Sequence, residues 1–233
     1  RPPLWGGGGG GGGGHSDWVQ CVTFSADGGW MASGSVDTTV KIWGVTDSSV
    51  SILRTLRDDR IGHVRGPVWS LTFSQDGSLL VSGCGDGSIK VWDPRTGSLY
   101  QTLRHHQAFV RSVSFTPDGG VLASASGDHT VMLWNVRSVL AGRGGDRIVL
   151  TGHTGPVTCV RWNSKGTRLA SSSRDMSIKI WNVSDWGDPK LEYSLLGHTY
   201  DVDCVNWNAD GSLVASGGSD HCVKVWDVEE RPP

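Results

Sequence analysis

Short runs in which apolar and polar residues alternate recur along the chain, and turn-forming residues separate them. In one clear stretch, Val157–Trp162 is rich in β-branched and aromatic residues, which is typical of a strand, and we expect a second and a third strand at Thr167–Ser172 and Ser177–Asn182. In the third run, Ile178 and Ile180 fall on one face of a strand and Trp181 on the other. A fourth apolar run, Leu191–Leu196, follows. This stretch therefore predicts four short strands in about 45 residues.

The same pattern occurs five times, and the chain contains no long amphipathic helical stretch. Each repeat begins with a His, has an Asp 22 residues later (23 in the second repeat) and closes with a Trp six residues after that Asp. Insertions fall between repeats, where we expect loops such as Arg137–Gly145. These features predict an all-β fold. The repeats span residues 15–44, 63–93, 106–135, 153–182 and 198–227.

A Ser stands four residues before each Asp, so every repeat carries a His, a Ser, an Asp and a Trp. The alternative interpretation is a hydrolytic triad, but that requires one exposed nucleophile and an oxyanion hole. The set occurs five times, the Ser falls in a strand, and no G-x-S-x-G motif is present, so a structural role is favoured. The sets are His15, Ser33, Asp37, Trp43; His63, Ser82, Asp86, Trp92; His106, Ser124, Asp128, Trp134; His153, Ser171, Asp175, Trp181; and His198, Ser216, Asp220, Trp226.

The repeats resemble those of WD-repeat β-propellers over residues 15–227. Gly-His dipeptides begin four of the repeats, and Trp92-Asp93 and Trp226-Asp227 keep both letters of the closing dipeptide. The resemblance implies five four-stranded blades, in each of which a hydrogen-bonded chain of His, Ser, Asp and Trp ties the loop before the first strand to the second and third strands.

The resemblance also implies a partner-binding rim, built from the residue before each first strand and the residue before each turn Asp. Trp18 and Phe109 are the candidate anchors, because exposed aromatic residues often dominate interfaces; for Trp18, packing on its own loop is an equal alternative. For Trp69, core packing is favoured over a place on the rim. Arg174 and Asp201 bring opposite charges to adjacent blades. The rim pairs are Trp18 and Val36, Pro67 and Gly85, Phe109 and Gly127, Pro156 and Arg174, and Asp201 and Ser219.

The number of repeats and the two ends of the chain bear on whether the ring closes. Residues 1–14 contain a glycine run, which predicts a flexible tether before a propeller at 15–228, and residues 229–233 are a proline-containing tail. The glycine run is not a phosphate-binding loop, since no Gly-Lys-Ser/Thr follows it. Neither end reads as a closing strand. We therefore expect an incomplete last blade, in an open arc or a fragment of a larger, seven-bladed propeller.

Composition limits the classes of partner. The formal net charge of −2 disfavours direct nucleic-acid binding, and no apolar run approaches the ~18 residues of a membrane span. Cys21, Cys159 and Cys204 occupy equivalent positions, where small buried side chains are expected. No secretory leader is recognisable and no cysteines form a close pair, so we expect an intracellular protein of the cytoplasm or nucleus.

We find no catalytic, metal-binding or cofactor-binding motif. The leading hypothesis is a non-catalytic scaffold that binds peptides or protein partners on a propeller rim. One alternative is a subunit of a nucleic-acid- or chromatin-associated complex. Another is a regulatory or sensor propeller fused to an effector domain, while an enzyme is disfavoured.

Overall fold

A computed structural model describes residues 13–58, 66–142 and 146–229 and shows five antiparallel sheets. Four sheets have four strands and the last has three, as expected for an incomplete final blade. Blade 1 contains β1 (Val19–Phe24), β2 (Trp30–Ser35), β3 (Val40–Val45) and β4 (Val50–Leu56); blade 2 contains β5 (Val68–Phe73), β6 (Leu80–Cys84), β7 (Ile89–Trp92) and β8 (Leu99–Leu103). Blade 3 contains β9 (Val110–Phe115), β10 (Val121–Ser126), β11 (Val131–Asn135) and β12 (Arg147–Leu150). Blade 4 contains β13 (Val157–Trp162), β14 (Arg168–Ser173), β15 (Ser177–Asn182) and β16 (Lys190–Leu196); blade 5 contains β17 (Val202–Trp207), β18 (Leu213–Gly218) and β19 (Val223–Asp227).

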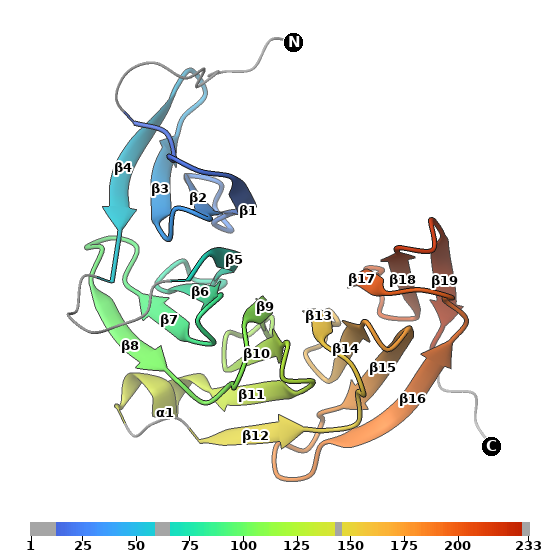
Figure 1. The fold of residues 1–233 in the computed structure, drawn as a ribbon. Helices are drawn as coiled ribbons and strands as arrows, with labels where there is room; N and C mark the ends of the chain where they lie inside the picture. Colours follow the sequence, from blue (N-terminus) through green and yellow to red (C-terminus); the bar gives the residue numbers. More distant parts are fainter. Residues whose placement is uncertain (1–12, 59–65, 143–145, 230–233) are drawn as a thin grey trace.

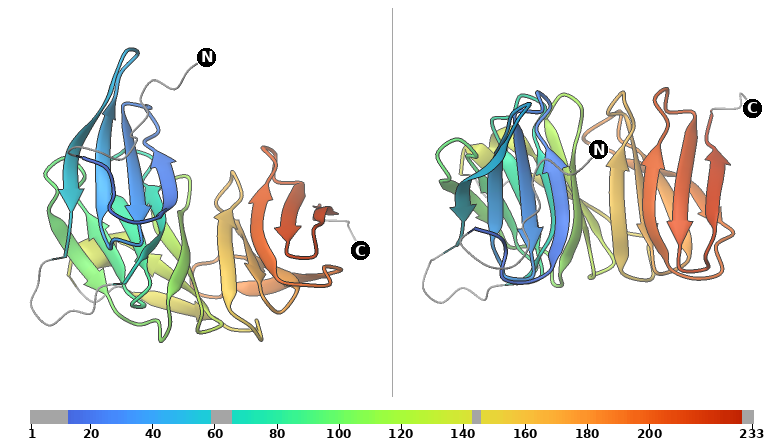
Figure 2. Two further views of the ribbon diagram at one scale, coloured as in Figure 1. Left: turned by 45° about the horizontal axis from the view of Figure 1, so that its top comes forward. Right: turned by 90° about the horizontal axis from the view of Figure 1, so that it is seen from above.

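Each blade is a meander in which consecutive strands pair, and the blades stand side by side in an open arc (Figure 1). The first strand of each blade, β1, β5, β9, β13 and β17, lines the inner side of the arc, and β4, β8, β12 and β16 lie outermost. Figure 2 shows the gap between blade 1 and blade 5 from two further directions. The fold is therefore an open propeller arc of five blades.

One connection differs from its prediction. The segment predicted as a loop, Arg137–Gly145, overlaps a short helix, α1 (Val136–Leu140). The side chain of Asn135 caps it by accepting a hydrogen bond from the backbone N–H of Ser138 at 3.1 Å. Val139 is buried against the core between blades 2 and 3. The prediction of a loop was wrong at these positions because capping and burial stabilise a helix too short to show a periodic pattern.

The core lies between neighbouring blades, in four apolar clusters. In blades 2 to 4 one face packs on the preceding blade and the other on the following blade, and we call these two sides of every blade the leading face and the trailing face. Val68 on the leading face of blade 2 sits over Gly34 of blade 1, and its Cγ1 lies 2.5 Å from where a Cβ on that glycine would stand. Val110 sits in the same way over Gly83, at 2.9 Å. A small residue on one blade thus receives a valine from the next.

The two end faces of the arc expose residues that are buried in the other blades. Val22 and Phe24 on the leading face of blade 1 are 62% and 57% exposed, whereas their equivalents in blade 2, Leu71 and Phe73, are both 8% exposed. On the trailing face of blade 5, Cys204 is exposed. The expectation that this cysteine is buried was wrong, because burial of its equivalent Cys159 depends on a following blade.

Among the residues that the structure describes, no helix is long and apolar enough to cross a bilayer.

Candidate functional site

The predicted rim residues meet in pairs at one end of the blades. In every blade the residue before the turn Asp donates its backbone N–H to the carbonyl of the residue before the first strand. Each hydrogen bond therefore holds a pair together where the first strand of a blade begins and the second strand ends. The bonds are Val36 to Trp18 (2.9 Å), Gly85 to Pro67 (2.7 Å), Gly127 to Phe109 (2.9 Å), Arg174 to Pro156 (2.9 Å) and Ser219 to Asp201 (2.8 Å).

A β-bulge near the start of each first strand adds a further residue to this rim. The register shifts there, so that one extra residue of the first strand faces no partner on the second. Bulges re-aim side chains away from the regular alternation of a strand. The sequence prediction missed four of these residues, although their place one residue after the valine that opens each strand was a usable signal. The bulge residues are Gln20, Trp69, Arg111, Thr158 and Asp203.

Trp69 belongs to this rim. It is only partly buried, and the guanidinium carbon of Arg111 on the next blade lies 4.7 Å from the centre of its ring. This distance is typical of a cation–π contact. A Cβ on Gly85 would stand 3.1 Å from the indole nitrogen, so this glycine makes room for the ring. The interpretation of Trp69 as a core residue was therefore wrong.

The aromatic side chains predicted as anchors differ in exposure. Trp18 is 78% exposed, so it does not pack on its own loop. Phe109 is half-buried because its ring lies over Gly127, whose absent Cβ would stand 2.6 Å from the nearest ring carbon. Trp18, Trp69 and Phe109 thus make blades 1 to 3 the aromatic part of the rim, which we call the aromatic shelf.

On blades 4 and 5 the charged side chains of the rim are engaged in an ion pair and a hydrogen bond with each other and with their neighbours. Arg174 Nε lies 3.5 Å from a carboxylate oxygen of Asp201, which places the predicted opposite charges together. The hydroxyl of Ser219 donates to Asp203 at 2.8 Å. By contrast, within the described residues no carboxylate forms an ion pair with Arg111, so the aromatic shelf carries an exposed positive charge.

Below the rim, the His, Ser, Asp and Trp side chains form a directed hydrogen-bond chain. In blade 4 the indole N–H of Trp181 donates to Ser171 Oγ at 2.9 Å, and Ser171 Oγ lies 2.8 Å from His153 Nε2. His153 Nδ1 lies 2.8 Å from Asp175. Since a carboxylate only accepts, His153 Nδ1–H donates to Asp175, and Nε2 of the same ring forms the hydrogen bond to the serine hydroxyl. Every member is satisfied, as a buried network requires.

The same contacts recur in blades 1, 3 and 5, through His15, His106 and His198. In blade 2, Trp92 donates to Ser82 at 3.0 Å, while His63 lies outside the described residues. There, Asp86 accepts from the backbone and hydroxyl of Ser88 and forms an ion pair with Arg104 at 3.5 Å.

The scan against protein-family models decides the family. The model of the WD domain, G-beta repeat, matches residues 13–44, 51–93, 97–135, 145–182 and 189–227. The chain belongs to the WD-repeat family. Among curated proteins, no match was found.

The turn Asp of these WD repeats is held ionised by its contacts. Burial opposes ionisation of Asp175, but hydrogen bonds from His153 and Ser177 outweigh it and hold the pKa of this carboxyl well below its usual range. The pKa of Asp128 is lowered in the same way, by His106 and Thr130 against burial. These carboxylates also accept the backbone N–H that follows each His, which fixes the loop before the first strand.

Ser, His and Asp contact one another in the same order as in a hydrolytic Ser-His-Asp triad. A hydrolytic role would require that a substrate can reach the serine hydroxyl. Ser171 and Ser124 are fully buried, and their Oγ atoms already contact both the His and the Trp. An acyl substrate would have to displace the indole to reach them. Burial also raises the pKa of the Cys21 thiol to about 12, which disfavours a thiolate nucleophile. In the part of the chain that the structure describes, no group of three or more His, Cys, Asp or Glu residues could hold a metal ion.

Proposed function

We propose that this WD-repeat chain is a non-catalytic scaffold whose aromatic shelf binds a peptide segment of a protein partner. The observation that supports the proposal is the contact of Arg111 with Trp69 across the boundary between blades 2 and 3. Tryptophan and arginine are the residue types most enriched among the residues that dominate binding energy at interfaces. The five-repeat match adds support, since WD domains generally bind protein partners.

The chemistry of the shelf indicates which segments fit it. Trp69 and Phe109 offer ring surface at little entropic cost, because each lies over a glycine that fixes its place. Arg111 adds a guanidinium that can bind a carboxylate in a two-pronged contact. We therefore expect an extended peptide in which a large apolar residue stands beside an Asp or Glu. The paired charges at Arg174 and Asp201 offer less, because a ligand there would first have to break their ion pair.

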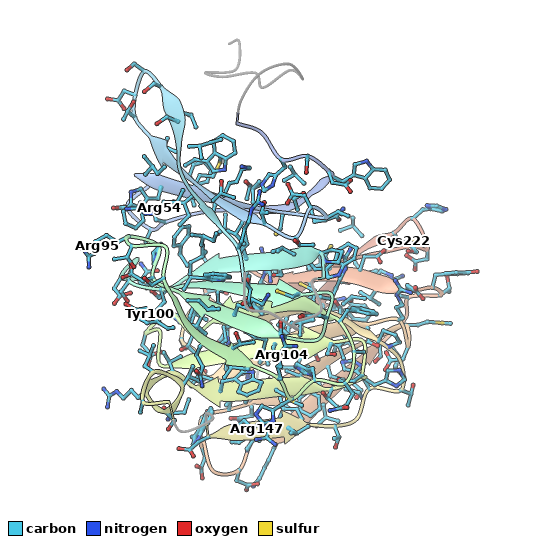
Figure 3. All side chains as sticks on the ribbon, turned by 60° about the vertical axis from the view of Figure 1, so that its left-hand side comes forward. Arg54, Arg95, Tyr100, Arg104, Arg147 and Cys222 are labelled. Carbon is cyan, nitrogen blue, oxygen red and sulfur yellow. The ribbon has the colours of Figure 1, made fainter. Side chains whose placement is uncertain are left out.

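Peptide display on the purified chain tests this proposal. Selected peptides, measured by fluorescence anisotropy, should carry the apolar–acidic pattern and lose about tenfold or more in affinity with Trp69→Ala or Arg111→Ala. Tyr100→Ala is the matched control, since this exposed tyrosine, labelled in Figure 3, lies on the outer strand β8, whereas Trp69 and Arg111 lie on the inner strands β5 and β9. If the rim variants bind the selected peptides as tightly as the wild type and the control do, the aromatic shelf is not the binding surface.

A further inference from the structure

A groove runs along the end of the blades that lies opposite the rim. The rim lies where each first strand begins, so the turns between first and second strands and the segments after the third strands lie at the other end. Two hollows of about 440 and 420 Å³ open there, and both are lined by Asp118, Gly119 and Val136. Because they share these residues, the hollows are parts of one groove, which we call the α1 groove.

The short helix α1 builds one wall of this groove. In the part of the chain that the structure describes, only blade 3 has a helix between its third and outer strands. The helix lies against β11 of its own blade and β8 of blade 2 (Figure 1). Val139 is buried in the core between these blades, whereas Leu140, one residue further along, is 50% exposed and lines the groove. The insertion therefore adds an accessible apolar side chain that the other blades do not have at this place.

Apolar side chains from three blades line the α1 groove. Leu79 of blade 2 and Val136 of blade 3 line the first hollow. Trp186, in the connection between β15 and β16 of blade 4, lines the second hollow and packs against the core between blades 3 and 4. It is only partly buried, so part of its ring system is available to a ligand. Partly exposed tryptophans of this kind are common anchors of interfaces.

Two carboxylates border the first hollow. Asp76 and Asp118 occupy equivalent positions in the turns of blades 2 and 3, and both are exposed. The hydroxyl of Ser74 donates to Asp76 at 2.6 Å, and that of Thr116 donates to Asp118 at 2.6 Å. These hydrogen bonds lower the pKa of both carboxyls, so both are ionised at neutral pH. Within the described residues neither carboxylate forms an ion pair, so their charges are free to bind a cation.

The charges of the groove determine which class of partner fits it. Among the described residues that line the first hollow there is no lysine or arginine, while Arg137 is exposed beside Trp186 in the second. A phosphate of a nucleic acid or a lipid would be repelled from the first hollow, whereas an ammonium or guanidinium group would be attracted. Lys and Arg side chains also cover apolar surface with their aliphatic stems. They therefore suit a groove that combines apolar walls with two carboxylates.

We propose that the α1 groove is a second interaction surface, which binds a segment of a protein partner in which Lys or Arg residues stand beside large apolar residues. The cationic groups of the segment bind Asp76 and Asp118, and its apolar side chains pack on Leu140 and Trp186. The groove and the aromatic shelf lie at opposite ends of the blades. They also differ in the charge they select, since the shelf fits an acidic segment and the groove a basic one. The proposal for the groove therefore stands independently of that for the shelf.

A fluorescein-labelled synthetic peptide with the sequence LKFRLK is the probe. Titration with the full chain should give saturable binding by anisotropy, and hydrogen exchange should slow in α1. The acidic counterpart LEFELE, which has the same apolar residues, should bind about tenfold more weakly or less tightly still. Raising the salt concentration from about 50 mM to about 500 mM should weaken binding of LKFRLK, because salt screens the exposed carboxylates.

Variants of the chain, each with a matched control, locate the site. The double variant Asp76→Asn, Asp118→Asn keeps acceptors for the turns but removes both charges, and should bind LKFRLK about five- to twentyfold more weakly. Asp210→Asn is its control, because Asp210 occupies the equivalent turn of blade 5 and its carboxyl also has a lowered pKa, through a hydrogen bond from Ser212. Leu140→Gln should lower affinity about threefold or more by removing apolar contact. Its control is Leu53→Gln, at a leucine that is 49% exposed on β4.

Both controls should bind LKFRLK like the wild type, and thermal unfolding would show that each variant is folded. The proposal is overturned if the folded wild type binds LKFRLK no more tightly than LEFELE, or if the double Asp→Asn variant binds it as tightly as Asp210→Asn does. It is also overturned if light scattering shows a stable dimer that Leu140→Gln dissociates and Leu53→Gln does not, because the occupant of the groove would then be a second copy of the chain.

Discussion

Val68 on β5 fills the space above Gly34 on β2, with its Cγ1 2.5 Å from the position of a Cβ on that glycine. The contact joins blade 1 to blade 2 at a point where both backbones are part of regular strands. Because neither strand can move without breaking its ladder, the glycine is required by close packing and not by its backbone angles.

We therefore predict that Gly34→Ala destabilises the protein by about 1–3 kcal/mol, the usual effect of overpacking. The matched control is Gly217→Ala at the equivalent position of blade 5, where the nearest atom is Cys204 Sγ at 3.2 Å and no following blade lies over the glycine in the described residues. It should change stability by less than about 1 kcal/mol. Urea unfolding measures both. Equal effects of the two substitutions would contradict the packing argument.

Ser171 tests the hydrogen-bonded network. Ser171→Ala leaves the indole N–H of Trp181 and Nε2 of His153 buried without the hydroxyl that joins them. We expect a loss of about 1–3 kcal/mol in the free energy of unfolding, the penalty for buried polar groups left unsatisfied. Ser184→Ala, on an exposed loop, should stay within about 0.5 kcal/mol of the wild type.

A double-mutant cycle measures the contribution of the hydrogen bond between Ser171 and Trp181. Trp181→Phe removes the donor but keeps an aromatic ring, so the Ser171→Ala and Trp181→Phe effects should couple by at least about 0.5 kcal/mol. Additive effects would show that the hydrogen bond between the two side chains contributes nothing to stability.

The turn aspartates predict how stability depends on pH. The pKa values of Asp37, Asp128 and Asp175 are held below the unfolded value of about 3.9. For Asp37, burial opposes this and hydrogen bonds from Thr39 and Ser16 dominate. Since the folded state prefers the ionised form, the stabilisation is fully present above the unfolded pKa. It is lost as pH falls below about 4 toward the folded value.

Asp175→Asn should therefore reduce the loss of stability between pH 5 and pH 3, measured by urea unfolding at each pH. It should also lower stability at neutral pH, where the carboxylate otherwise accepts from His153 and Thr154. Asp47→Asn, at an exposed loop position, is the control and should leave the wild-type slope. An unchanged slope for Asp175→Asn would show that other groups govern the acid transition.

The strands and the shared network could be predicted from sequence because each is repeated. One His, Ser, Asp and Trp set resembles a hydrolytic site, and only comparison with the other four sets favours a structural role. The bulge residues could not be assigned in this way. Trp69 is itself the extra residue of a bulge, which interrupts the alternation of inward and outward positions along the strand. The sequence pattern alone therefore places this aromatic residue in the core.

The local sequence pattern also did not predict which apolar side chains are exposed at the two ends of the arc. Phe24 has the same place in its strand as Phe73, yet one is 57% exposed and the other 8%. The difference depends on whether another blade lies against the face, which no feature of the strand itself encodes. Arg111 shows the same limit, because its partner Trp69 lies on a neighbouring blade.

Backbone strain at the turn after each Asp gives the last prediction. Thr38 has φ +70°, in the left-handed region, and Gly87 at the same position of blade 2 has φ +79°. A β-branched residue is the least suited to this conformation. We expect Thr38→Gly to raise the free energy of unfolding by up to about 1 kcal/mol, because relief of the strain exceeds the added entropy of the unfolded glycine.

Two further substitutions test whether the effect comes from the backbone angle. Gly87→Ala should destabilise, since the new methyl group would adopt a strained φ and stand 3.0 Å from the carbonyl oxygen of Ala108. Thr199→Gly, at an exposed position without positive φ, should be neutral or destabilising. Thermal and urea unfolding of the three variants would decide the matter. If Thr38→Gly destabilises as much as Thr199→Gly does, the contacts of the Thr38 side chain, and not its backbone angle, determine the stability of this turn.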